Sequence, residues 1–224
     1  MRAEFLKRTD SLVQWVGAQR NVLAGDLSGR IALSTLARLQ HLYAVGPLAE
    51  LRGEISIFDG VPLISRAVDG GIRTDIDFSG EACFLVYAQV DAWREIEMPE
   101  PIADEATLQE AIVNIALRMA IDVSRPFPFM IRATPERALF HVLDKRDGLG
   151  HNAELHEKAK VRFAIIAQSV EIVGFYSHFH RGVFTPLNSN FHMHVRTLDN
   201  ALSGHLDVIR SVQNARLYLP AKEK

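Results

Sequence analysis

The sequence predicts an α+β protein in which mixed or antiparallel β-sheets form two closely packed lobes with a few helices. Alternating apolar and polar residues dominate two regions, roughly 51–91 and 129–219, and this period of two is typical of strands. Helical periodicity is confined to the start of the chain and to one central segment. No linker divides the chain, so we expect a single domain over 1–224, with lobes 1–124 and 125–224.

The composition narrows the class of protein. The chain is 48% hydrophobic and 23% charged, enough for an ordinary buried core. A net charge of -2 and a pI of about 6.5 give no overall basic field, so no nucleic-acid partner is expected. Cys83 is the only cysteine, which excludes an intrachain disulfide and a cysteine-based zinc site. The charged start MRAEFLKRTD is unlike a secretory signal, and no apolar run could span a membrane, so we expect a cytoplasmic protein.

Three helices are expected. Residues 10–23 carry apolar side chains at helical spacing, and the Ala-Gly pair that follows ends the pattern. Ser34 is expected to cap a second, short helix with the sequence STLARLQHL. Thr107 and Glu110 form a capping-box pattern before EAIVNIALRMAI, which predicts the clearest helix of the chain. The stretch SRPFP at 124–128 ends that helix.

Most other segments are expected to be strands. The Asp-Gly pairs at 59 and 69 interrupt the alternating stretch ELRGEISIFDGVPLISRAVDGG and indicate two hairpins. Residues 81–90 form another strand pattern, and four more follow in FMIRAT, ALFHVL, VRFAIIAQ and VEIVGFYSHF. Residues 145–157 are polar with two glycines and are expected to form a loop.

A histidine hairpin carries the main chemical signal. FHMHVRT and SGHLDVIR alternate on either side of the turn formers Asp199 and Asn200. If those two residues form the turn, His194 faces His205 directly, and His192 lies two positions along on the same face. The Cβ atoms of directly opposite residues lie about 5 Å apart, and those of residues two apart on one strand about 6.5–7 Å. Three imidazoles at these positions can bind one ion at metal–nitrogen distances of about 2.0–2.1 Å. The alternative is a set of unrelated core or surface histidines.

Three nitrogen ligands leave an open coordination position, which is typical of catalytic rather than structural metal sites. With nitrogen ligands and no thiol, Zn2+ is the expected ion, with another divalent metal as the alternative. A second alternating pair, His178 and His180, has no third partner and is expected to lie in a hairpin or at a rim.

The stretch HMHVRTLDNALSGHLD resembles the metal-binding segment of the α-acetolactate decarboxylase family. There, His-x-His is followed after ten residues by a histidine that a glycine precedes, as Gly204 precedes His205 here. The likeness continues in VLAGDLSGRIALSTLARLQHLYAVGPLAELRGEISIFDGV, PFPFMIRATPERALFHVLDKR and VEIVGFYS, and so covers most of the chain. The resemblance implies the fold of that family, a zinc ion bound by His192, His194 and His205, and a catalytic Glu54 in the family's Leu-x-Gly-Glu motif.

The activity that the resemblance implies is a metal-dependent carbon–carbon lyase of acetoin biosynthesis. Its substrate would be acetolactate or a similar 2-hydroxy-3-oxo acid, and its products would be acetoin or an analogue and CO2. A Lewis-acidic metal would stabilise the enediolate left by loss of CO2. A positioned carboxylic acid would then protonate the carbon.

Three departures from the family pattern bear on that activity. The family's active-site arginine falls on Lys145, which is therefore the candidate for holding the substrate carboxylate, with Arg146 beside it. A Gly-Thr pair of the family is Gly46-Pro47 here. The chain stops at RLYLPAKEK, where the family continues into a tail with a second catalytic glutamate, and Glu223 is no clear substitute. The resemblance therefore implies a weak or altered enzyme.

Two other classes fit parts of the pattern. The plant-and-prokaryote conserved domains, some of which bind DNA, also carry His-x-His and Gly-Gly-His on adjacent strands. A non-enzymatic, metal-stabilised binding module is therefore the alternative function, although the Leu-x-Gly-Glu match and the length favour the decarboxylase relatives. Cupin oxygenases also use His-x-His, but Val195 to Leu198 supplies no glutamate ligand. The oligomeric state stays open, with a homodimer among the alternatives.

Overall fold

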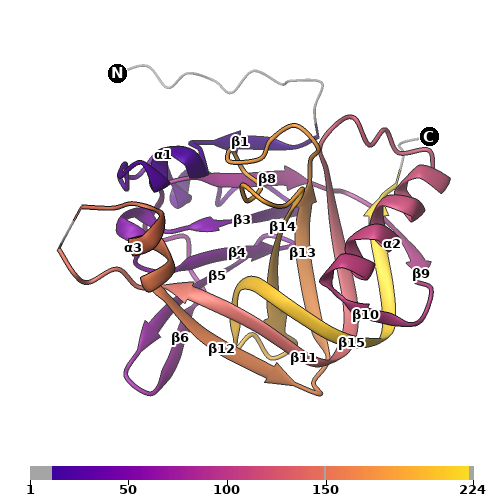
Figure 1. The fold of residues 1–224 in the computed structure, drawn as a ribbon. Coiled ribbons are helices and arrows are strands. Elements are labelled where there is room, and N and C mark those ends of the chain that lie inside the picture. The colour runs from indigo at the N-terminus through magenta and orange to yellow at the C-terminus, as the bar shows by residue number, and fades with distance from the viewer. Residues whose placement is uncertain (1–11, 149, 222–224) are drawn as a thin grey trace.

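The first of two large sheets is built from the N-terminal part of the chain. The structure is a computed structural model that describes residues 12–148 and 150–221 (Figure 1). Six antiparallel strands follow the order β1-β8-β3-β4-β5-β6. Their bounds are Gln14–Val16 for β1, Leu85–Gln89 for β8, Leu42–Pro47 for β3, Glu54–Phe58 for β4, Val61–Val68 for β5 and Gly71–Asp75 for β6.

The second sheet has seven antiparallel strands and closes on itself. Its order is β10-β15-β14-β13-β11-β12, with β9 also paired to β15. Because β11 pairs with β15 as well as with β13, the strands β11, β13, β14 and β15 form a closed ring. The bounds are Trp93–Glu97 for β9, Ile102–Asp104 for β10, Phe127–Leu143 for β11, Lys160–Ile166 for β12, Val170–Tyr176 for β13, Phe191–Thr197 for β14 and Ser203–Pro220 for β15.

Helices, 3-10 turns and a small two-stranded ladder accompany the two sheets. The helices are α1 at Gln19–Leu23, α2 at Glu105–Arg118 and α3 at Ala153–Lys158, and α2 lies beside β10 and β15 (Figure 1). Two 3-10 turns occupy Leu33–Thr35 and Ala49–Leu51, and a small ladder pairs β2 (Ile31–Ala32) with β7 (Glu81–Ala82). No helix in the described residues is long and apolar enough to cross a membrane.

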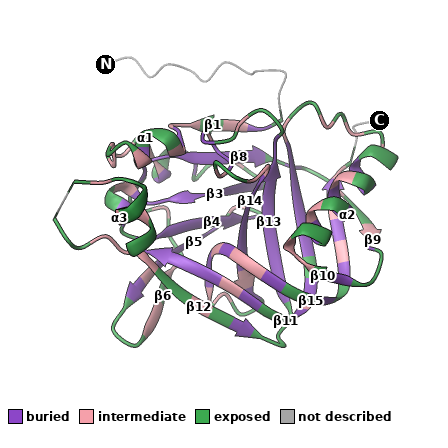
Figure 2. Ribbon diagram, viewed as in Figure 1, coloured by how far each residue is buried: buried purple, intermediate pink, exposed green. Residues whose placement is uncertain are grey.

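The two sheets pack face to face over an apolar core. Val45 and Val86 of the first sheet meet Val173 and Phe175 of the second, and all four side chains are buried. Figure 2 shows buried residues along the strands where the sheets meet and exposed residues along one face of α2. The predicted α+β class with antiparallel sheets is therefore confirmed. The assignment of the chain to one domain stays a prediction.

Two predicted N-terminal helices are wrong over most of their length. In the described part of 10–23, residues 14–16 form strand β1, and only Gln19–Leu23 is helical. Gly17 separates them at φ +73°, a left-handed conformation, and an added Cβ there would lie 2.5 Å from a carbonyl oxygen. Of the stretch STLARLQHL, only Ser34 and Thr35 are helical, as the end of the 3-10 turn Leu33–Thr35. Leu33 and Leu36 instead pack onto the outer face of the first sheet.

The central helix is confirmed, but its start differs from the predicted capping box. Asp104 is the N-cap, and its side chain accepts a hydrogen bond of 2.9 Å from the backbone N of Thr107. Thr107 hydrogen-bonds back to the Asp104 backbone, so it serves as the third helical residue rather than as the cap. The predicted loop 145–157 contains the start of α3, which Asn152 caps.

Candidate metal centre

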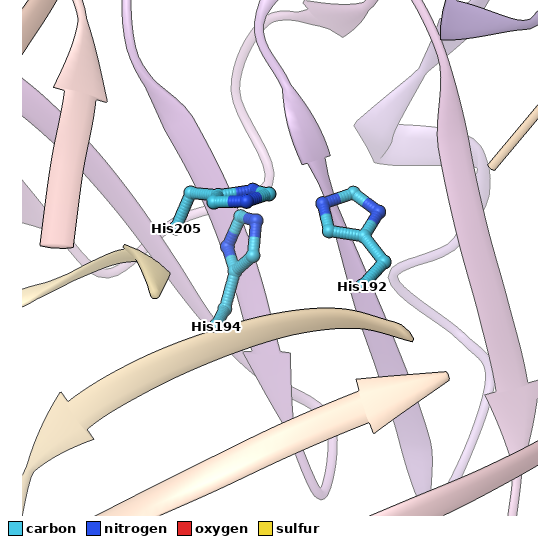
Figure 3. Close-up of side chains that lie close together, drawn as sticks. All are labelled: His192, His194 and His205. Atoms are coloured by element: carbon cyan, nitrogen blue, oxygen red, sulfur yellow. The ribbon is translucent and has the colours of Figure 1, made fainter. Parts of the chain in front are cut away.

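Strands β14 and β15 bring three histidines together. His194 pairs directly with His205 across the hairpin, and His192 lies two residues earlier on β14. Their ligand nitrogens all lie within 4.8 Å of one another, and Figure 3 shows the three rings facing one another. Asn200 takes a left-handed φ of 61° in the turn, and Asp199 accepts a hydrogen bond of 3.0 Å from the Ala201 backbone. The predicted register of the hairpin is therefore confirmed.

The hydrogen bonds of these rings fit a bound metal. His192 Nδ1 donates to the Phe184 carbonyl oxygen at 2.8 Å, which leaves Nε2 as the unprotonated nitrogen. His194 Nδ1 lies 2.9 Å from Ser56 Oγ, while His194 Nε2 is buried without a hydrogen-bond partner in the described structure. An unpartnered buried nitrogen is costly, and a divalent ion would supply the missing partner.

Burial also keeps the three rings neutral, as metal ligands must be. It lowers the pKa of His192 to about 4 and lowers the pKa values of His194 and His205 well below the usual range. Neighbouring histidines lower all three pKa values further. The unprotonated nitrogens are therefore available near neutral pH.

Glu54 faces the histidines from the other sheet. Its carboxyl group is 2% exposed, with Oε2 at 3.7 Å from His194 Nε2 and Oε1 at 3.9 Å from His141 Nε2. Burial raises the pKa of Glu54 well above its usual value, and the charge of Asp207 raises it further. Burial also lowers the pKa values of His141 and His194, so it disfavours the charged form of all three groups.

His141 is a site residue that the sequence reasoning missed. It lies on β11 directly opposite His205 of β15, and the two ring centroids are 4.7 Å apart. Its Nδ1 hydrogen-bonds Asp207 at 2.8 Å, so Nε2 is directed toward Glu54. Nothing within ALFHVL distinguishes this histidine from an ordinary core residue, because its position depends on the pairing of β11 with β15.

A cavity of about 700 Å3 adjoins the site, a volume in the usual range for small-molecule pockets. Glu54, His141, His192 and His205 line one part of it. The other lining residues come from several elements and include Phe84, Phe184, Leu143, Asp104, Glu105, Gln109, His156, Lys160 and Arg210.

The predicted residue Lys145 lies outside this lining. It follows the end of β11, its backbone N donates to the Leu51 carbonyl oxygen at 3.0 Å, and its ammonium pairs with Asp147. Arg146 is largely exposed and pairs with Asp144 at 2.6 Å. The structure therefore brings Glu54 to the three histidines but does not bring Lys145 to the cavity wall.

Two other candidates also lie apart from the centre. His178 is exposed, and His180 stacks on Phe184 at 4.8 Å, as expected of residues at a rim. Glu223 lies outside the described residues.

Gly204 is required for the close approach of β15 to β11. An added Cβ would lie 2.5 Å from the His141 carbonyl oxygen and 2.8 Å from the Phe140 ring.

We expect Gly204→Ala to destabilise the fold by about 1–3 kcal/mol and to weaken metal binding, because His205 must move with the strand. Urea unfolding with and without zinc measures both effects. Gly71→Ala is the control, since its Cβ meets nothing within 4 Å, and equal stability of the two variants would contradict the prediction.

His156 makes the stability of the protein sensitive to acid. Burial, together with the charge of Lys160, lowers its pKa to about 4. The unfolded chain takes up this proton at about pH 6.5, so native stability from this group is present above that pH and is lost as the pH falls toward 4.

Between about pH 7 and about pH 5 we expect the metal-free wild type to lose about 1–2 kcal/mol more stability than His156→Gln. Urea unfolding at the two pH values measures the difference. Equal losses would show that His156 does not carry the effect.

Together, the fold and the site define a class of protein: two packed antiparallel sheets with a buried three-histidine centre beside a small-molecule cavity. Comparison with solved structures finds the same fold in α-acetolactate decarboxylases. The α-acetolactate decarboxylase of Bacillus subtilis strain 168 is 16% identical with a TM-score of 0.73, over 95% of this chain and 86% of that one. The acetolactate decarboxylase of Bacillus subtilis subspecies spizizenii is 17% identical with a TM-score of 0.72, over 94% and 86%.

A Staphylococcus aureus protein of unknown function, described as similar to alpha-acetolactate decarboxylase, is 13% identical with a TM-score of 0.75, over 94% of this chain and 86% of that one. No family model matches the sequence, and no curated protein matches it either. The resemblance inferred from the histidine hairpin is thus confirmed at the level of the fold.

Proposed function

We propose that this protein is a metal-dependent decarboxylase that converts acetolactate or a similar 2-hydroxy-3-oxo acid to acetoin or an analogue and CO2. One observation carries the proposal: the buried carboxyl group of Glu54 lies 3.7 Å from the unpartnered Nε2 of His194, beside a cavity of small-molecule size. The proposal includes Zn2+, or another divalent ion, on His192, His194 and His205. The protein would act in the cytoplasm on a small molecule rather than on nucleic acid.

The ion would supply Lewis acidity at the oxygens of the bound substrate. As the bond to the carboxylate carbon breaks, CO2 leaves and the electron pair of that bond stays with the substrate. One proton must then reach the substrate carbon, and Glu54, whose carboxyl pKa is raised by burial, would donate it. Water in the cavity returns a proton to Glu54 between turnovers.

His141 positions Glu54 in this scheme. Asp207 accepts the Nδ1 proton of His141 and holds the ring, so Nε2 presents a lone pair toward Glu54 Oε1 at 3.9 Å. Phe84, Phe184 and Leu143 line the cavity as well, and these apolar side chains limit the water around the reacting carbon.

The resemblance alone gives Lys145 a role in this reaction. In this role its ammonium would hold the substrate carboxylate until CO2 leaves. Because that ammonium pairs with Asp147, the role requires the pair to open.

A substrate panel tests the proposed activity. Protein stripped of metal and reloaded with zinc is given racemic acetolactate and longer-chain 2-hydroxy-3-oxo acids, and acetoin or its analogue is measured. We expect zinc-dependent product formation from at least one acid. Stoichiometric zinc without product from any of them would contradict the enzymatic proposal and would favour the metal-stabilised binding module.

A further inference from the structure

Two positively charged side chains in the described part of the chain line the cavity beside the metal centre and have no role in the proposed reaction so far. Among the described residues that line the cavity, the cationic side chains are Lys160 and Arg210. Arg210 is exposed and lies opposite Asp104, the N-cap of α2, in the pairing of β15 with β10. It therefore lies near the α2 side of the cavity, and the cation on the β12 side is Lys160.

The pairing of β11 with β12 places Lys160 next to the reacting groups. Lys160 begins β12 directly opposite Leu143, the last residue of β11. His141 lies two residues before Leu143, so both side chains project from the same face of the strand, and both line the cavity. Since opposite residues in an antiparallel pair share a face, Lys160 projects to that side as well.

The charge of Lys160 acts on the site. It lowers the pKa of Glu54, although burial is the larger influence and leaves that pKa raised. It also lowers the pKa values of His141 and His205. Lys160 therefore adds positive potential where a substrate carboxylate would approach the three histidines.

The present partner of Lys160 is easily exchanged. Its Nζ lies 2.8 Å from Glu157 Oε2, and the Glu157 side chain is 57% exposed. The Lys160 side chain is 20% exposed, and Glu157 also pairs with Arg162, so Glu157 keeps a cationic partner when Lys160 turns to a ligand. Because the pair is open to solvent on the Glu157 side, a substrate carboxylate can replace Glu157 at small cost. Lys145, by contrast, has a side chain that is only 6% exposed and is paired with Asp147 away from the cavity lining.

We propose that Lys160, rather than Lys145, binds the carboxylate of the 2-hydroxy-3-oxo acid. This inference rests on the proposed function and names the group that orients the substrate in the cavity. A single ammonium on a flexible stem attracts a carboxylate without clamping it in two places, so it suits a group that must leave as CO2.

Binding of two unreactive ligands to zinc-loaded protein tests the assignment. 2-Hydroxyisobutyrate has the hydroxyl and carboxylate groups but no 3-oxo group, and acetoin has no carboxylate. Calorimetry gives the Kd of each ligand for wild type, Lys160→Met, Lys160→Arg, the competing candidate Lys145→Met and the matched control Lys158→Met, an exposed lysine outside the cavity lining. We expect Lys160→Met to weaken 2-hydroxyisobutyrate at least about tenfold, the effect of one charge-assisted hydrogen bond, and to leave acetoin and zinc binding unchanged. Lys160→Arg should retain most of the affinity, Lys145→Met should lose much less affinity than Lys160→Met, and Lys158→Met should match wild type.

Several outcomes would overturn the assignment. A loss confined to Lys145→Met would give the carboxylate to Lys145. An equal loss of both ligands in Lys160→Met would indicate general damage to the cavity, and no binding of 2-hydroxyisobutyrate to zinc-loaded wild type would remove the carboxylate site altogether. If wild type binds this ligand through Lys160 but turns over no 2-hydroxy-3-oxo acid, the proposed function fails while the carboxylate site stands.

Discussion

Replacing His194 with alanine is expected to lower zinc affinity by about 10²–10⁴-fold. A structural zinc ion binds with a free energy of about 10–16 kcal/mol, and the loss of one ligand in three removes roughly a third of it. His194 Nε2 is a buried nitrogen without a hydrogen-bond partner in the described structure, and it points into the cluster of three, so an ion bound there would supply the partner. Competition with a chromophoric chelator measures the zinc affinity, and zinc-dependent turnover should fall with it.

The matched control for this variant is His178→Ala. His178 is an exposed histidine that precedes β14 and lies outside the cluster of three, so its removal should leave zinc affinity unchanged. Wild-type zinc affinity in His194→Ala would show that the hairpin does not bind the ion through this residue.

Replacing Glu54 with glutamine is expected to lower kcat by about 10²–10⁴-fold, the usual contribution of a general acid. Glutamine keeps the size of the side chain and an acceptor for the Leu143 backbone but has no acidic proton. Zinc content should stay at one ion per chain, because Glu54 is not among the three clustered ligands. Steady-state acetoin formation at saturating zinc measures the effect.

Glu136→Gln provides the control for Glu54→Gln, because Glu136 is exposed and does not line the cavity. A kcat of Glu54→Gln within about threefold of wild type would exclude Glu54 as the principal proton donor.

The histidine cluster could be predicted from sequence because all three histidines belong to one hairpin. A period of two and a turn centred on Asp199 and Asn200 determine which residues face each other, so local pattern alone places His192, His194 and His205 on one face. Glu54 lies on the other sheet, and only the family resemblance indicated its role. Its contact with His194 depends on how the two sheets pack.

The rest of the cavity could not be predicted from local pattern. His141 and Lys160 reach the site through the pairing of β11 with β15 and β12, strands that are set by tertiary contacts. The prediction of a helix over residues 10–23 was wrong for a related reason. Trp15 pairs with Val86 in the first sheet, and this pairing overrides the helical spacing of the apolar residues. Short-range periodicity carries no information about such partners.

The central claim is that the three-histidine centre is an open metal site that binds the substrate. Cobalt(II) in place of zinc reports this directly, since its visible absorption depends on coordination number and geometry. We predict that the cobalt-substituted protein changes its visible spectrum when acetolactate is added, and that the change reverses as acetoin forms. A spectrum that acetolactate leaves unchanged at full cobalt occupancy, with no acetoin produced, would identify a closed structural centre and contradict the account.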